Sequence, residues 1–536
     1  MLRVGGECAR RRLLARHVRS FGALTAKPYA FNARPWELRK TDTVDVMDGM
    51  GASVQVHTKQ GEVVRVQPRE NDEINEEWIH DKTRYAYDGL KRQRLTRPLV
   101  RGENSWDETH STWRGAFQHI AHAVKNSKAK NGGTPKVRAI VGASVELNST
   151  VALADWVESI ADTTVESLGS NGGIFGADVE SLFRFNSGVL GLEESDFCLL
   201  VGTHVTHEAP LLQLRLRKMF LRDQTEVCSL GMPLDLTFPI AQAGLTAKSL
   251  IDIAKGNHPI CEKLKSAKKP AILVGAQVYE REDGATLAAA IETIAENSGN
   301  LRQYDEATGE LSWNGVNVVH NSANDCGHLE LARTKPFESN QPPADILYLL
   351  GVSASELPVP IEELVGENTF VVTQAHHGDA LTSRADVVLP GGAFTEKSGV
   401  YVNFEGRPQK ARNAITPPVD AREDWKIIRA LSEVVDGPTL PFDSESDVQD
   451  RLVSLLPSLN HRNKVSKASA PSDLVGKEFA KYCKSQVDKG TVNNTPFRPQ
   501  VYDFYLDGSV IAESSATMAK SSRQLNKRSN FIEMEY

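Results

Sequence analysis

The chain of 536 residues has no closely spaced cysteines, although it contains six. Iron–sulfur clusters and structural zinc sites usually take thiolates from close pairs such as CxxC, and small disulfide-bonded domains are much denser in cysteine. The sequence therefore favours none of these sites. We expect buried, unreactive thiols at the six positions, which are Cys8, Cys198, Cys228, Cys261, Cys326 and Cys483.

Other features are absent as well. No apolar run approaches the roughly 20 residues that a membrane-spanning helix needs. The formal net charge is −7, so the basic footprint of a nucleic-acid-binding protein is missing. Neither GxGxxG nor GxxxxGK[ST] occurs, which removes the usual glycine-rich phosphate loops. The composition, 40% hydrophobic and 24% charged, is typical of a globular protein with several domains.

The N-terminal segment differs from the rest of the chain. Its first twenty residues hold six arginines and one acid, Glu7, with leucines between the arginines. A helix of this composition would be basic and amphipathic, which is typical of a mitochondrial transit peptide. We therefore expect residues 1–21 to be a transit peptide that is cleaved near Ser20. A disordered basic tail is the alternative.

The patterns along the chain predict an α/β fold with four further parts. A small β-rich domain is expected at residues 22–100, because SVQVHT and VVRVQP alternate in polarity around the turn KQGE. Short apolar strands with helical crossovers follow, which predicts parallel sheets covered on both faces. We expect two such lobes, residues 101–335 and 336–435. Residues 436–536, with Pro, Ser and Lys clusters, are expected to form an irregular, partly helical tail.

Three polar stretches follow predicted strands. Gly202 and Thr203 end one strand, where α/β sheets often bind ligands, although a lone Gly-Thr pair is also an ordinary strand end. HHGD (376–379) is expected to be a hydrogen-bonding turn, because adjacent residues rarely converge on one metal ion. FTEKSGVYVNFEGRPQ (394–409) is predicted to be a structured polar loop that binds a ligand or joins the two lobes.

A fourth stretch, TVDVMDGMGASVQV (43–56), places Asp45 and Asp48 three residues apart in a glycine-bearing loop. The residues alone leave open whether the loop is a carboxylate metal site, an ordinary turn or the remnant of a lost site.

Longer motifs resemble a known fold. The segment ADVVLPGGAFTEKSGVYVNFEGRPQ (385–409) resembles the signature of the molybdopterin oxidoreductases. GALTAKPYAFNARPWE (22–37), INEEWIHDKTRYAYDGLKRQRLT (74–96) and DFYLDGSVIAESSATMAK (503–520) resemble one branch of that fold, the large (75 kDa) iron–sulfur subunits of mitochondrial NADH:ubiquinone oxidoreductase, complex I. The resemblance implies a molybdopterin-oxidoreductase-like fold and a structural subunit of the matrix arm, without catalytic residues of its own.

The resemblance also says what has changed at the Asp45 loop. It places Asp45, Asp48, Ala52 and His80 where cofactor-bearing relatives carry the four cysteine ligands of a 4Fe-4S cluster. Two carboxylates and one imidazole cannot replace four thiolates. We therefore expect these to be vacated ligand positions, the two acids to be solvated turn residues, and no metal or cofactor to be bound by this chain.

The family's cysteine-rich region does not precede residue 22, which predicts the C-terminal half of a split subunit. A separate cysteine-rich partner would then hold the 4Fe-4S and 2Fe-2S clusters; a truncated gene model is the alternative. Residues following the family's last cluster ligand are expected to pack beside a partner-held cluster. They are Gly22, Ala23, Leu24 and Thr25.

The resemblance implies a place in the cell as well. Other matrix-arm subunits, including the flavin-bearing one, are the expected partners, on the matrix side of the mitochondrial inner membrane and without nucleic acid. Two other functions remain open from the sequence. One is a molybdenum- or tungsten-dependent oxidoreductase related to formate dehydrogenases, and the other is a free-standing nucleotide-binding α/β protein.

Overall fold

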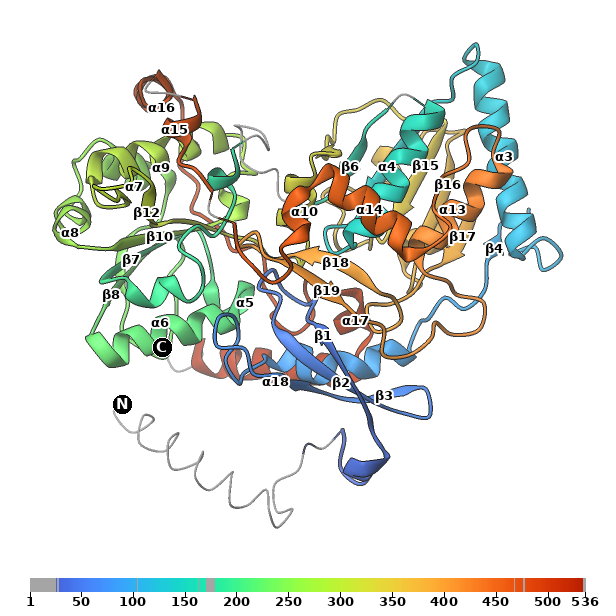
Figure 1. The fold of residues 1–536 in the computed structure, drawn as a ribbon, viewed down its shortest axis with the longest axis horizontal. Helices are drawn as coiled ribbons and strands as arrows, with labels where there is room; N and C mark the ends of the chain where they lie inside the picture. The colour runs from blue at the N-terminus through green and yellow to red at the C-terminus, as the bar shows by residue number, and fades with distance from the viewer. Residues whose placement is uncertain are drawn as a thin grey trace.

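The structure is a computed structural model, and it describes residues 26, 28–103, 105–161, 163–169, 179–466, 468–475 and 478–533. The expected transit peptide and the segment Gly22, Ala23, Leu24 and Thr25 lie outside these residues. Figure 1 shows two α/β lobes side by side, with a small β-sheet domain below them.

The N-terminal domain contains the predicted hairpin. Strands β1 (Arg39–Val44), β2 (Ser53–Lys59) and β3 (Glu62–Pro68) form an antiparallel sheet in that order. A 3₁₀ turn, η1 (Pro35–Glu37), precedes the sheet, and helices α2 (Asp81–Tyr85) and η2 (Ala86–Lys91) follow it. The loop between β1 and β2 is closed at its base, where Asp45 N–H donates to Ala52 O at 2.9 Å.

The larger lobe is a seven-stranded sheet in the order β14-β6-β5-β15-β16-β17-β4. Its strands are β4 (Leu99–Val100), β5 (Val137–Val141), β6 (Val165–Ser167), β14 (Thr334–Pro336), β15 (Ile346–Leu350), β16 (Phe370–Ala375) and β17 (Val387–Pro390). All pairings are parallel except that of the edge strand β4. The accompanying helices are α3 (Trp113–Lys130), α4 (Leu147–Ala161), α10 (Asp325–Leu331), α11 (Ile361–Leu364), α12 (Ala380–Arg384), α13 (Asp424–Val434) and α14 (Glu445–Leu455).

This sheet is buried on both faces, as its continuous apolar strands predicted. Residues of β15 alternate between two hydrophobic clusters, with Ile346, Tyr348 and Leu350 in one and Leu347 and Leu349 in the other. A strand covered on both sides needs apolar side chains at every position, which explains the unbroken apolar run.

The smaller lobe is a five-stranded parallel sheet in the order β13-β10-β7-β8-β9. Its strands are β7 (Phe197–Val201), β8 (Glu226–Leu230), β9 (Ala241–Gly244), β10 (Pro270–Gly275) and β13 (Val316–Val319). Helices α5 (Val205–Glu208), α6 (Pro210–Asp223), α7 (Ala247–Ala254), α8 (Ile260–Ser266) and α9 (Gly284–Ser298) belong to this lobe. A small hairpin, β11 (Arg302–Tyr304) and β12 (Leu311–Asn314), completes it.

The α/β fold with two lobes is confirmed, but the expected lobe boundary at residue 335 was wrong. Strand β15, which follows that boundary, lies between β5 and β16 and pairs with both. The smaller lobe is therefore inserted between two parts of the larger one. Strand–helix alternation identifies each unit but not which strands pair, because pairing is decided by contacts between distant segments.

The C-terminal region is more regular than predicted. Helices α15 (Pro471–Val475), α16 (Glu478–Lys489), α17 (Val510–Ser514) and α18 (Ala516–Glu533) follow a short turn, η6 (Pro457–Asn460). α16 packs on α9, and α18 contacts η2 and α2 of the N-terminal domain (Figure 1). Phe497, Ile511 and Met518 are buried, so the region is part of the core rather than an irregular tail.

Two expectations about missing features can be compared with the described residues. Within these ranges, none of the helices is long and apolar enough to cross a membrane. The cysteines of the described part are all free thiols, buried except for the partly exposed Cys261, as predicted. Cys8 lies outside the described residues.

Candidate functional site

The three polar residues at the vacated ligand positions come together in the structure. His80 Nε2 lies 3.3 Å from Asp45 Oδ2 and 3.3 Å from Asp48 Oδ2. The exposed fractions are 1% for Asp45, 3% for Asp48 and 7% for His80, so the expectation of solvated acids was wrong. The loop folds inward because its carboxylates meet a partner that is 32 residues away from Asp48 in the chain.

The buried carboxylates of this cluster have basic neighbours. Burial alone would lower the pKa of His80, but hydrogen bonding to Asp45 and Asp48 and their charges raise this pKa to about 9. Lys82 is also buried, and its pKa is lowered by burial against the opposing effect of Asp48 and Asp45. The two carboxylates thus share a buried region with the His80 ring and the Lys82 amine, and such partners make buried charge tolerable.

The donor set of this cluster does not fit a 4Fe-4S cluster. Such clusters are held by four thiolates, with imidazole as an occasional substitute. Here three residues offer carboxylate or imidazole ligands, and within the described part of the chain they form the one grouping with metal-ligand proximity. The fourth position, Ala52, is fully buried and offers only a methyl group.

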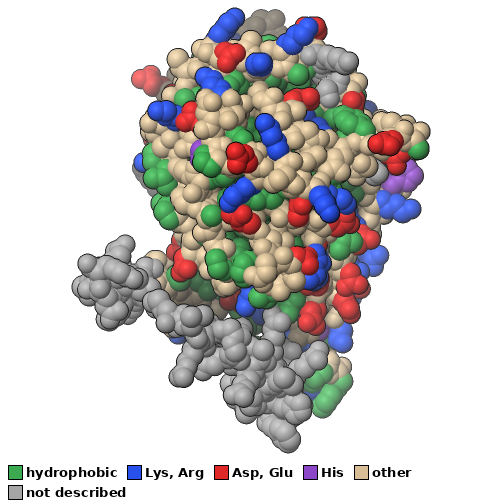
Figure 2. All heavy atoms as spheres, turned by 90° about the vertical axis from the view of Figure 1, so that its left-hand side faces the viewer, with side chains coloured by type: hydrophobic (Ala, Val, Ile, Leu, Met, Phe, Trp, Pro, Cys, Tyr) green, Lys and Arg blue, Asp and Glu red, His purple; other side chains and the backbone are tan. Residues whose placement is uncertain are grey.

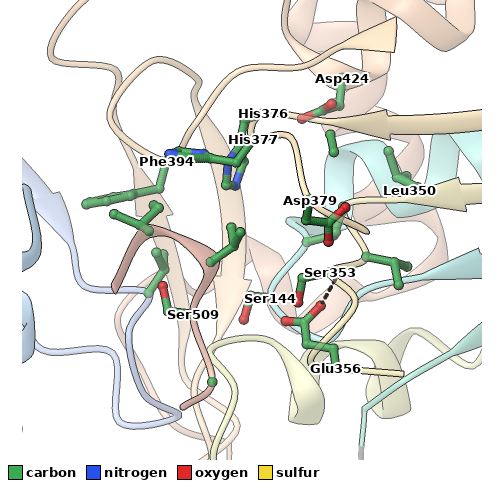
Figure 3. A pocket seen from close by; sticks show the side chains of 18 of the residues that line it. Ser144, Leu350, Ser353, Glu356, His376, His377, Asp379, Phe394, Asp424 and Ser509 are labelled. Carbon is green, nitrogen blue, oxygen red and sulfur yellow. Dashed lines mark hydrogen bonds between the residues drawn. The ribbon is translucent and has the colours of Figure 1, made fainter. Parts of the chain in front are cut away.

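The second feature of interest is a cavity at the carboxyl ends of β5, β15 and β16, where open α/β sheets bind ligands. Its volume is about 70 Å³, far below the roughly 300–1,000 Å³ of typical ligand sites. The C-terminal residues 508–511 form one wall, and Figure 3 shows Ser509 across the cavity from Leu350. The chain's own C-terminal segment therefore narrows the crevice of the larger lobe.

A buried ionic network lines the same cavity. Lys397 Nζ lies 2.6 Å from Glu146 Oε2 and 2.7 Å from Asp424 Oδ2. Burial alone would lower the pKa of Lys397, but the charges of Asp424 and Glu146 hold it well above its usual value. The lysine is thus a fixed cation that joins three segments.

The equivalent end of the smaller sheet is closed too. Glu208 accepts hydrogen bonds from Thr203 Oγ1 at 2.5 Å, from His204 N–H at 3.1 Å and from Gln500 N–H at 3.0 Å. The donors that follow this strand therefore bind the protein's own carboxylate. Gly202, which has φ +62°, packs beside Phe497, and an added Cβ there would clash with Val278 Cγ2.

The other stretches singled out in the sequence make structural contacts. HHGD forms the predicted turn: His377 Nε2 lies 3.0 Å from Gly89 O, and Asp379 caps α12. Neither histidine belongs to a metal-ligand grouping of the described residues.

The polar loop 394–409 joins the N-terminal domain to the larger lobe, whereas the sequence predicted that it binds a ligand or joins the two lobes. Glu396 accepts a bidentate pair from Arg94 at 2.5 and 2.6 Å. Asn403 Nδ2 donates to Met50 O at 3.0 Å, and Gln409 Nε2 donates to Gly51 O at 2.9 Å. Within this loop, β18 (Gly399–Val402) and β19 (Pro408–Ala411) form a hairpin. These residues tie the N-terminal domain to the larger lobe.

Comparison with known proteins identifies the family. Residues 38–88 match the family described as NADH-ubiquinone oxidoreductase NDSU1/NuoG-like, 4Fe-4S domain, and residues 94–434 match Molybdopterin oxidoreductase. The 75 kDa subunit of NADH-ubiquinone oxidoreductase from Reclinomonas americana is 37% identical over 94% of this chain and 70% of its own length. This chain belongs to the 75/78 kDa subunit family. The mitochondrial 78 kDa subunit from Candida albicans is 41% identical over 93% of this chain and 66% of its own length.

The 75/78 kDa family members are longer than this chain, which spans about two thirds of the relatives' length, from 64% to 70%. A solved structure of acetylene hydratase from Pelobacter acetylenicus has a TM-score of 0.57 and 14% identity, and covers 89% of this chain and 81% of its own. That likeness concerns the fold alone. The predicted family and the molybdopterin-oxidoreductase-like fold are confirmed.

One expectation about the iron–sulfur clusters was wrong. They were assigned to a separate partner chain, whereas residues 38–88 of this chain, where vacated ligand positions were predicted, match the 4Fe-4S domain of the 75/78 kDa family. The matched region contains all four vacated positions, Asp45, Asp48, Ala52 and His80. The domain type is present, while its residues lack the thiolates that its description implies.

Proposed function

We propose that this chain is a structural subunit of the matrix arm of mitochondrial complex I, where it supports electron transfer from NADH to ubiquinone through clusters held elsewhere in the complex. The observation that carries this proposal is the 41% identity to a 78 kDa subunit over 93% of the chain. Similarity of this length extends over both lobes and the N-terminal domain, and so it is more specific than a match to one short motif.

The geometry supports a scaffold rather than a molybdopterin-dependent enzyme. Both strand ends that would face a cofactor are occupied by residues of the C-terminal region, among them Phe497, Gln500 and Ser509. Lys397 is paired with Glu146 and Asp424 inside the protein, and Glu208 accepts hydrogen bonds from Thr203, His204 and Gln500. A fixed frame of this kind suits a subunit that holds redox partners at constant spacing.

We infer that the partners are other matrix-arm subunits, including the flavin-bearing subunit and a separate cysteine-rich chain, on the matrix side of the inner membrane. Three of the compared relatives are named mitochondrial. Phe31 and Trp36, which are 103% and 80% exposed, lie before the N-terminal sheet and offer an apolar surface for such a partner. Figure 2 shows basic and acidic side chains interspersed on the face of the smaller lobe, without a basic patch for nucleic acid.

Depletion of this chain in its source cells tests the proposal. We expect blue-native electrophoresis to show loss of assembled complex I and of NADH:ubiquinone activity, with restoration by re-expression. An unchanged level of assembled, active complex after depletion would refute the proposal. Molybdenum or tungsten bound to the purified chain would instead support the alternative, a molybdopterin-dependent oxidoreductase.

A further inference from the structure

The Asp45 loop and helix α2 are held together by a network of polar side chains at the positions where cluster ligands are absent. In each aspartate, one oxygen shapes the loop: Asp45 Oδ1 accepts from Met47 N–H at 3.2 Å, and Asp48 Oδ1 accepts from Met50 N–H at 3.0 Å. The other oxygen of each carboxylate lies 3.3 Å from His80 Nε2; Asp45 Oδ2 also accepts from the Thr83 hydroxyl, whereas Asp48 Oδ2 has only this ion-pair contact. The loop is therefore pre-shaped to present both Oδ2 atoms to one ring.

Helix α2 supplies the other half of the network. Its N-cap is His80, whose Nδ1 lies 3.2 Å from Thr83 N–H. The Thr83 hydroxyl lies 2.9 Å from His80 Nε2 and donates a short hydrogen bond to Asp45 Oδ2. Thr83 thus connects the ring to the carboxylate, and three side chains from two segments share one set of hydrogen bonds.

A third segment covers the network from the C-terminal region. The ring of Phe504 lies 5.8 Å from the His80 ring and 5.6 Å from Lys82 Nζ. Lys82 Nζ donates to Asp507 O at 3.1 Å. Because these contacts exclude water, the hydrogen bonds beneath them are stronger than exposed ones. The network joins segments that are more than 400 residues apart in the chain.

We propose that His80, with Thr83, Lys82 and the carboxylates of Asp45 and Asp48, is a metal-free replacement for the cluster that the 4Fe-4S domain type is named for. A metal cluster cross-links the segments that supply its ligands and stabilises their fold. Here hydrogen bonds and paired charges make that cross-link. The domain consequently folds without iron and offers electrons no side path from the clusters of the complex.

Two observations favour this arrangement over a bound cluster. The three donors are carboxylates and an imidazole, and the fourth position, Ala52, offers only a methyl group. Lys82 is buried in the same region, with its ammonium group 5.6 Å from the Phe504 ring and 3.1 Å from Asp507 O. A bound cation would have to share this buried region with a fixed ammonium group.

The metal content of the full-length purified chain tests the proposal directly. We expect fewer than about 0.1 iron, zinc or sulfide per chain, and the same unfolding midpoint with and without EDTA, because no ion contributes to the fold. A stoichiometric ion whose removal by EDTA lowers the unfolding midpoint would overturn the proposal in favour of a metal site. This measurement uses the wild-type chain and so does not depend on the folding of any variant.

A double-mutant cycle measures the cross-link itself. Asp48→Asn and His80→Gln are expected to be coupled by about tenfold in the unfolding equilibrium constant, because the two groups are in contact. Asp81→Asn, at the exposed neighbour of His80, is the matched control and should show no coupling to Asp48→Asn. Additive effects of the first pair would contradict the proposed role of His80.

Discussion

Gly89 is a position where the C-terminal segment lies directly against the backbone of the N-terminal domain. An added Cβ at Gly89 would lie 2.0 Å from Ile511 O, a backbone atom that cannot turn away. Gly89→Ala therefore forces η2 and α17 apart, and over-packing of this kind typically costs about 1–3 kcal/mol. A cost of about 2 kcal/mol corresponds to about a 30-fold rise in the population with the segment displaced.

Limited proteolysis followed by mass spectrometry measures this population. When opening and closing are faster than cleavage, the cleavage rate follows the open fraction, so cleavage within residues 503–520 should rise about 30-fold. Gly191→Ala is the matched control, because no atom lies within 4 Å of its added Cβ, and it should cleave as the wild type does. Equal cleavage of Gly89→Ala and wild type would refute the close contact that closes the crevice.

Three further predictions concern a buried carboxyl group, a buried ion pair and an exposed tryptophan. Burial, with the nearby Glu513 and Asp379 charges, raises the pKa of Glu356 from 4.5 to about 7, so the folded state binds a proton that the unfolded state releases. Stability should therefore fall as pH rises from about 4.5 to about 7, by about 2 kcal/mol after allowance for partial exposure, and Glu356→Gln should flatten this slope in denaturation curves. Arg94→Met should cost about 3–5 kcal/mol by leaving Glu396 buried and unpaired, whereas a double change that adds Glu396→Gln should recover much of the loss. Trp36→Ser should change the free energy of unfolding by less than about 0.5 kcal/mol yet reduce co-purification with complex I.

Much of the fold could be predicted because periodicity is local. The hairpin at β2 and β3 and the apolar strands β7, β10 and β15 follow from the alternation and length of short segments. The division of strands between the sheets was not predictable, because β5 and β15 are adjacent only through long-range packing. The prediction of an irregular C-terminal tail failed for the same reason. Phe497 and Ile511 look like isolated apolar residues until their distant partners are known.

The candidate site, too, could be predicted only where local sequence patterns decide it. The spacing of Asp45 and Asp48 marked the loop, and the resemblance added His80, but burial depends on what covers them. Phe504 and Lys82 come from segments that the loop does not identify.

Mass spectrometry of complex I, isolated through its flavin-bearing subunit, tests the central claim most directly. The account predicts one copy of this chain per complex, together with the other matrix-arm subunits. Complete absence of this chain from the intact, active complex would contradict the account.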